Sequence, residues 1–349
     1  MNTLQVNGGG YSRPQNRAAG LDIIRGIAIF FVIAGHFFLH TGFNTTNFSG
    51  VSMFIQGMAQ SLFIINVDLF MMLTGYLNIN KRVERNYYLN GLRVIISYLF
   101  ISVVVILFRK YYSGDDYTWT QWFLKITDFS AIPYAWYIEM WIGLFLLTPF
   151  LNILWCNIES RKNKRILILT LYLLTALPDF FNRYGVSLMP GWWENLFPLE
   201  FYFLGAYVRE YRPDVAKWKL ALLILAVCLV NPIFNVLFVR NHSMMHIMGD
   251  GNGLFGIPLA VFVFLLFYRT DIKNGLLCKI LALVSVLSLD MYLFSWMFDD
   301  LVYGYVNSLG MSQSKLGIWF FAIVGTIFML SLSAAWVKRI VFRLLRIPT

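Results

Sequence analysis

Several ionisable side chains lie inside apolar blocks of this 349-residue chain. A charged group in hydrocarbon costs roughly 2.5–3.5 kcal/mol on insertion scales unless it is paired or faces water. The group comprises Asp22, Arg25, His36, His40, Asp68, Glu139, Glu200 and Asp290. So many ionisable residues need a polar interior, and they are candidates for binding or chemistry.

Arg25 and His36 are eleven residues apart, which is close to three full helical turns. On a helix they project from one face, about 16 Å apart along the axis. Asp22 lies one turn before Arg25 and His40 one turn after His36, so the face carries a polar stripe. Neutral imidazole can remove a hydroxyl proton or accept an acyl group, and arginine binds phosphate. The alternative, purely structural roles are a hydrogen bond between helices for His36 and, for Arg25, a side chain that extends to the lipid headgroups.

The elements that must position these residues are membrane spans. Hydrophobic residues make up 58% of the chain and charged residues 13%, with a mean hydropathy of +0.64, which excludes an ordinary soluble domain. The sequence predicts an all-α integral membrane protein, with about ten transmembrane helices around a polar intramembrane cavity. Residues 1–20 are predicted to be a flexible cytoplasmic tail, and residues 21–349 the transmembrane domain. The predicted spans are roughly 22–41, 59–79, 88–108, 135–155, 166–181, 193–208, 220–239, 254–268, 276–298 and 316–341.

Basic residues between the spans predict the orientation. With the N-terminus inside, 21 of the 28 Lys and Arg residues lie on the cytoplasmic side, in agreement with the positive-inside rule. Both termini are therefore predicted to be cytoplasmic, with the chain in the cell (inner or plasma) membrane. The basic clusters are short and carry no nucleic-acid motif, so no nucleic-acid partner is expected despite the net charge of +10. The spacing of cysteines and histidines gives no metal set, and no metal is expected.

Five stretches resemble the acyltransferase-3 family of membrane proteins, in its branch of surface-polysaccharide O-acetyltransferases. The first, LDIIRGIAIFFVIAGHFF (21–38), carries the family hallmark of Arg, ten residues and His. The others are VDLFMMLTGYLNINKR (67–82), AWYIEMWIGLFLLTPFLN (135–152), PLEFYFLGAYVREY (198–211) and LSLDMYLFSWMFD (287–299). The resemblance implies transfer of an acyl group, usually acetyl, from cytoplasmic acyl-CoA to a hydroxyl of an extracytoplasmic glycan. It also implies that His36 is the catalytic histidine and that Arg25 helps to hold CoA.

The remaining polar residues are assigned roles by their predicted depth. A carboxylate could orient the His36 ring, and the candidates are Glu139, Glu200 and Asp290, although Glu139 lies close enough to the interface to be simply solvated. Family members often carry a tight basic pair after the second span, whereas here the cations that could bind CoA phosphates are spread as Lys81, Arg82, Arg85 and Arg93. Residues with a substrate-binding or structural polar role are Asp22, Asp68, Trp136 and Tyr137.

The expected partners are acetyl-CoA as acyl donor, a glycan or sugar acceptor and the lipid bilayer, and an oligomer is allowed. His36 is preferred as a base over an acetyl-histidine intermediate. A transporter or flippase for a lipid-linked sugar or small solute is the alternative from another class, because the same stripe and carboxylates could line a translocation route. A glycan polymerase is a third hypothesis. The sequence does not decide the acceptor. It also does not decide whether the acyl group is acetyl, succinyl or another.

Overall fold

The computed structural model describes residues 19–183, 187–239 and 242–347, so almost all of the predicted tail lies outside the described residues. Within these ranges the secondary structure is helical and contains no β-strand. The elements are α1 (Ala19–His40), η1 (Phe43–Thr45), α2 (Gly50–Phe63), α3 (Asn66–Asn78), α4 (Arg85–Phe108), η2 (Arg109–Ser113), α5 (Trp119–Thr127), α6 (Trp136–Asn157), α7 (Arg161–Phe181), η3 (Gly191–Leu196), α8 (Phe197–Tyr211), α9 (Lys217–Phe234), η4 (Asn235–Val239), α10 (Gly256–Phe267), α11 (Gly275–Ser308), α12 (Gln313–Ile318) and α13 (Phe320–Leu344).

In the described residues, seven helical segments are long and apolar enough to cross a membrane. They are Ala19–His40, Gly50–Asn78, Arg85–Ser113, Trp136–Asn157, Lys217–Val239, Gly275–Ser308 and Phe320–Leu344. Helices α7, α8 and α10 occupy the other three predicted spans, but α7 is too polar and the other two are too short to meet the same standard. The chain is therefore an all-helical, multi-pass membrane protein, and ten crossings remain a prediction.

The second predicted span is broken between α2 and α3. The Asn66 side-chain amide donates to the carbonyl oxygen of Phe63 at 2.9 Å, and its oxygen accepts from the N–H of Val67 at 2.7 Å. These bonds satisfy backbone groups that the break releases. The same amide nitrogen would lie 3.5 Å from a Cβ added at Gly35 on α1. The break therefore brings a polar side chain against α1, one residue before His36.

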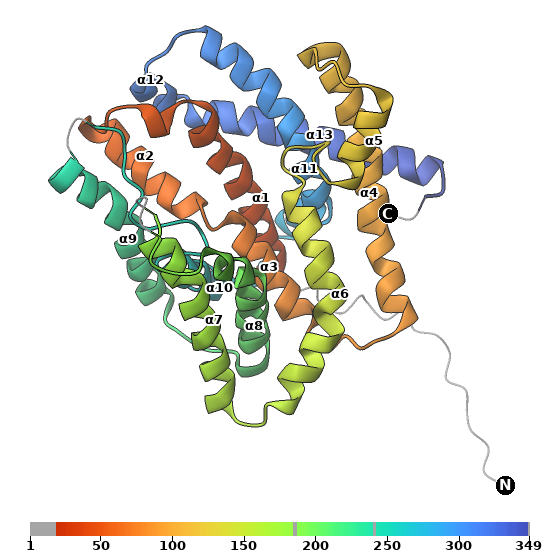
Figure 1. Ribbon diagram of the computed structural model, residues 1–349, viewed down its shortest axis with the longest axis vertical. Helices are drawn as coiled ribbons and strands as arrows, with labels where there is room; N and C mark the ends of the chain where they lie inside the picture. The colour runs from red at the N-terminus through yellow and green to blue at the C-terminus, as the bar shows by residue number, and fades with distance from the viewer. Residues whose placement is uncertain (1–18, 184–186, 240–241, 348–349) are drawn as a thin grey trace.

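Helices α1 and α3 lie in the middle of the bundle, with α7 to α10 to one side and α4 and α5 to the other (Figure 1). Two glycines let α3 and α8 pack backbone to backbone. A Cβ on Gly75 would overlap the carbonyl oxygen of Tyr202, and one on Gly205 would overlap that of Met72. Close approach through small residues is the usual way in which helices associate in a membrane, where the lipid is as apolar as the side chains.

Several helix ends meet at one end of the bundle. The Asn152 amide of α6 donates to the carbonyl oxygen of Asn78 at 2.7 Å, and Lys164 of α7 pairs with Glu210 of α8 at 2.9 Å. A cavity of about 510 Å³ lies between the same ends, lined by Ile79, Asn80, Trp155, Cys156, Lys164, Arg209, Glu210 and Arg212. The C-terminal ends of α3, α6 and α8 therefore lie beside the first turn of α7.

Candidate active site

His36 on α1 faces Asp299 on α11. The Nδ1 atom of His36 lies 2.8 Å from the Oδ2 atom of Asp299, whose side chain is fully buried. A buried carboxylate is costly unless it is paired, and the imidazole ring supplies the partner. The Nδ1 atom makes this contact by distance, without the direction of a hydrogen bond, and Nε2 remains the nitrogen for proton transfer to or from a ligand.

Tyr134 connects this pair to a second histidine. Its hydroxyl donates to Asp299 Oδ2 at 2.8 Å and lies 2.7 Å from Nε2 of His40. Its ring packs on the imidazole of His36, with centroids 4.0 Å apart. These four residues form one chain of polar contacts, which we call the His36 network. Because Asp299 faces His36 and accepts from Tyr134, the network can both orient the His36 ring and stabilise its protonated form.

A short loop after α5 presents Tyr134. Arg109 donates to the carbonyl oxygen of Ser130 at 3.4 Å. The Asp128 carboxylate accepts from the hydroxyl and the N–H of Ser130 at 2.7 and 2.9 Å, and these bonds hold the pKa of Asp128 below its usual range. On the other side, the Tyr292 hydroxyl of α11 donates to the carbonyl oxygen of Tyr134. Tyr134 is therefore positioned by both the loop and α11.

A cavity of about 310 Å³ lies beside α1 on the Arg25 side of the network. Arg25 donates to the Ser285 hydroxyl at 3.2 Å, and Tyr137 and Tyr292 form another part of the wall, their rings edge to face at 5.5 Å. None of the four network residues lines this cavity, but Tyr292 in its wall donates to the carbonyl oxygen of Tyr134 and so connects the cavity with the His36 network. Its lining consists of Arg25, Phe70, Leu73, Thr74, Leu77, Asn78, Val94, Tyr137, Trp141, Ser285, Val286, Ser288, Leu289 and Tyr292.

Two polar stripes face each other along α1 and α11. Ser285, Tyr292 and Asp299 recur every seven residues, which is close to two turns, so they share one face of α11. Ser285 contacts Arg25 and Asp299 contacts His36, so the two helices run parallel. The stripes extend from the Arg25 cavity to the His36 network, over about 16 Å of α1. This arrangement can connect an anionic ligand at Arg25 with a reaction at His36.

The acyltransferase-3 family model, described as an acyltransferase domain, matches residues 18–336. The chain belongs to this family. No match was found among curated proteins or among solved structures. The family predicted from the five stretches, the first of which carries Arg25 and His36, is thereby confirmed, and the protein is a membrane acyltransferase. The match does not specify the surface-polysaccharide O-acetyltransferase branch.

Asp299, the carboxylate in contact with His36, is not one of the three carboxylates that the sequence predicted to orient the ring. Glu139 is exposed at the start of α6. Glu200 is fully buried, but it lines a groove between α7, α8 and α10. Asp290 lies 2.7 Å from the ammonium of Lys338. The assignment of an orienting carboxylate among these three is corrected to Asp299.

Helix geometry explains why Asp290 cannot substitute for Asp299. The two residues are nine positions apart on α11, which is two and a half turns, so they project from opposite faces. The predicted ninth span ended at residue 298, whereas α11 continues to Ser308. Asp299 and Asp300 therefore looked like the first polar residues beyond the membrane, although Asp299 is fully buried.

The basic residues predicted to bind CoA line different cavities. Lys81 and Arg82 line one of about 580 Å³ beside the end of α6. Arg93 lines one of about 180 Å³ together with Asp290. Arg85 is exposed at the first residue of α4. Of the predicted cations, Arg25 is the one that lines the cavity connected with the His36 network.

The other predicted polar residues also have defined places. Asp22 is buried in the first turn of α1, where a carboxylate interacts favourably with the helix N-terminus. Asp68 is buried against Gly251, where an added Cβ would overlap its carboxylate. Tyr137 is buried in the wall of the Arg25 cavity, whereas Trp136 is 48% exposed, as expected for an interface aromatic.

Sequence reasoning missed Asp299 and Tyr134. The seven-residue recurrence of Ser285, Tyr292 and Asp299 could have revealed the polar face of α11. Tyr134 lies in a loop, where no helical period marks it. Within the described residues, no three His, Cys, Asp or Glu side chains are grouped so that they could hold a metal ion.

Proposed function

We propose that the protein transfers an acyl group, most simply acetyl, from cytoplasmic acyl-CoA to a hydroxyl of an extracytoplasmic glycan. The observation that carries the proposal is the pairing of His36 with the buried Asp299 carboxylate, in a chain that belongs to an acyltransferase family. An imidazole fixed through Nδ1 by a carboxylate is a suitable general base for an alcohol.

In the proposed reaction, Nε2 of His36 takes the proton of the acceptor hydroxyl. The hydroxyl oxygen attacks the thioester carbonyl carbon, the new C–O bond forms, and the C–S bond breaks. The CoA thiolate leaves with the proton returned from Nε2. Asp299 stabilises the imidazolium that exists between the two proton transfers. Direct attack of His36 on the thioester is the competing route, and it would leave an acyl-histidine.

The acyl donor is proposed to reach His36 from the Arg25 side. A guanidinium binds phosphate oxygens through paired hydrogen bonds, and CoA carries several phosphate charges. Arg25 lines the cavity connected with the network, and Lys81 and Arg82 line the cavity beside the end of α6. In the predicted orientation these residues face the cytoplasm, so the pantetheine arm would enter along the stripe between α1 and α11.

The test compares single variants of the purified protein in an assay that follows acetyl-CoA consumption and acetylated product. His36→Ala and Asp299→Asn should each lower turnover by about 100-fold or more, the usual contribution of a general base. Asp300→Asn is the matched control, because this neighbouring carboxylate accepts from the Ser113 hydroxyl. Unchanged glycan acetylation in cells that carry His36→Ala would contradict the proposal, as would solute uptake or lipid flipping that needs no acyl-CoA.

A further inference from the structure

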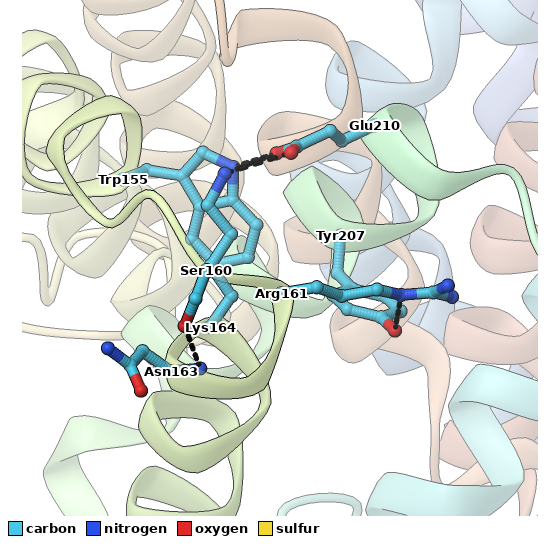
Figure 2. A network of polar contacts seen from close by, with 7 residues as sticks. All are labelled: Trp155, Ser160, Arg161, Asn163, Lys164, Tyr207 and Glu210. Carbon is cyan, nitrogen blue, oxygen red and sulfur yellow. Dashed lines mark hydrogen bonds and ion pairs between the residues drawn. The ribbon is translucent and has the colours of Figure 1, made fainter.

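Two arginines at the start of α7 converge on one tyrosine of α8. The Nε atoms of Arg161 and Arg165 donate to the hydroxyl of Tyr207 at 3.0 and 2.8 Å. The Arg161 guanidinium also lies over the ring of Tyr211, 4.5 Å from its centroid. Each guanidinium is thus fixed through Nε, and within the described residues no acceptor is recorded for the terminal nitrogens of either. Figure 2 shows those of Arg161 pointing away from Tyr207.

Glu210, a carboxylate of this region, is already paired. Glu210 accepts from the ammonium of Lys164 at 2.9 Å and from the indole N–H of Trp155 at 2.6 Å (Figure 2). It therefore does not compete for the terminal nitrogens of the two arginines. Arg161 and Arg165 form a preorganised positive pair, which suits an anion with several oxygen atoms.

An apolar groove begins at the same arginines. It has a volume of about 470 Å³, lies between α7, α8 and α10, and includes Arg165 and Tyr207 in its lining. Leu169 is 54% exposed there, so the groove is open at the surface of the helix bundle. The other lining residues are Ile168, Leu169, Tyr172, Glu200, Leu204, Val208, Pro213, Ile257, Pro258, Val261, Phe262 and Leu265.

The groove has one charged end and one apolar end. On α7, Arg161, Arg165, Leu169 and Tyr172 follow each other at helical spacing along one face, over about 16 Å. The buried Glu200 lies seven residues from Tyr207 on α8, about 10 Å from it along the helix axis. Its side chain has no exposed surface, and within the described residues no hydrogen-bond partner is recorded for either carboxylate oxygen.

We propose that this groove is a binding site for an anionic phospholipid. The headgroup phosphate would lie on the terminal nitrogens of Arg161 and Arg165, and one acyl chain along Leu169, Tyr172 and the face of α10. Charge complementarity argues for this occupant, since basic pockets between transmembrane helices select anionic lipids and zwitterionic ones gain less there. The site is separate from the His36 network, and the inference does not depend on the acceptor of the acyl group.

The test measures lipid binding to the purified full-length protein by native mass spectrometry in mild detergent. Phosphatidylglycerol should bind at least about fivefold more tightly than phosphatidylcholine with the same acyl chains. Arg161→Gln combined with Arg165→Gln should remove that preference and weaken phosphatidylglycerol binding about tenfold. Lys217→Gln combined with Lys219→Gln removes the same charge from exposed positions of α9 and should change neither value.

A second pair of variants tests the groove with both arginines intact. Leu169→Trp should fill the groove and lower phosphatidylglycerol binding, whereas Leu173→Trp, on the same helix but outside the groove, should not. Equal binding of the two lipids, or full binding by Leu169→Trp, would overturn the proposal. Displacement of the lipid by 10 mM inorganic phosphate would also overturn it, because the site would then bind a free anion and need no acyl chain.

Discussion

At the scale of single residues, Tyr134 decides whether the His36 network acts as one unit. Its hydroxyl donates to Asp299 and contacts His40, while its ring packs on His36. These two functions can be separated, because phenylalanine keeps the ring and removes only the hydroxyl. The hydroxyl holds Asp299 in the position from which it faces His36, so Tyr134 is a positioning residue for the proposed base.

Tyr134→Phe is expected to lower kcat about tenfold and to leave the KM for acyl-CoA nearly unchanged. A hydrogen bond to a charged group contributes about 1.5 kcal/mol, which corresponds to roughly a factor of ten in rate. Steady-state kinetics on the purified protein measures both constants. Tyr303→Phe is the control, because within the described residues no hydrogen-bond partner is recorded for the buried Tyr303 hydroxyl. An unchanged kcat in Tyr134→Phe would mean that Tyr134 acts through the packing of its ring alone, and an equal loss in both variants would mean that the loss is not specific to the hydrogen bond with Asp299.

At the scale of helices, the sequence predicted the elements with a continuous apolar block and missed their exact ends. The face of α1 that carries Arg25 and His36 follows from the helical period alone. The break between α2 and α3 could not be predicted, because it depends on hydrogen bonds of Asn66 that exist only in the folded chain. Asp299 was missed because a charged residue at the end of an apolar block looks solvated, and only the packing of α1 on α11 shows that it is buried.

The contact between α3 and α8 gives a prediction about stability. Gly205→Ala should lower the apparent melting temperature of the detergent-solubilised protein by several degrees, because the new methyl group would overlap the backbone of Met72. Overpacking of this kind costs about 1–3 kcal/mol. Gly325→Ala on α13 is the matched control, since its Cβ would meet no atom within 4 Å. That change should instead be neutral or stabilising, because alanine is favoured over glycine in helices by about 1 kcal/mol.

At the scale of the whole molecule, the parallel run of α1 and α11 bears on the number of crossings. If only the seven long apolar segments crossed the membrane, α11 would be the sixth crossing and would run opposite to α1. The contacts of Arg25 with Ser285 and of His36 with Asp299 require the same direction. An odd number of α7, α8 and α10 must therefore cross as well. Ten crossings satisfy this condition, and they keep most basic residues on one side.

Site-directed labelling can distinguish ten crossings from eight. The three native cysteines, all free, would first be replaced by serine, and single cysteines would then be placed at exposed residues between the helices concerned. A membrane-impermeant maleimide applied to intact cells should label Leu188→Cys and Ser243→Cys. It should label Lys162→Cys, Asp214→Cys and Asp271→Cys only after the membrane is opened, because these positions are predicted to be cytoplasmic.

Labelling of Lys162→Cys and Leu188→Cys from the same side would show that α7 does not cross. If α8 still crossed, its C-terminal end would then lie on the opposite side from the first turn of α7, in conflict with the pairing of Lys164 and Glu210.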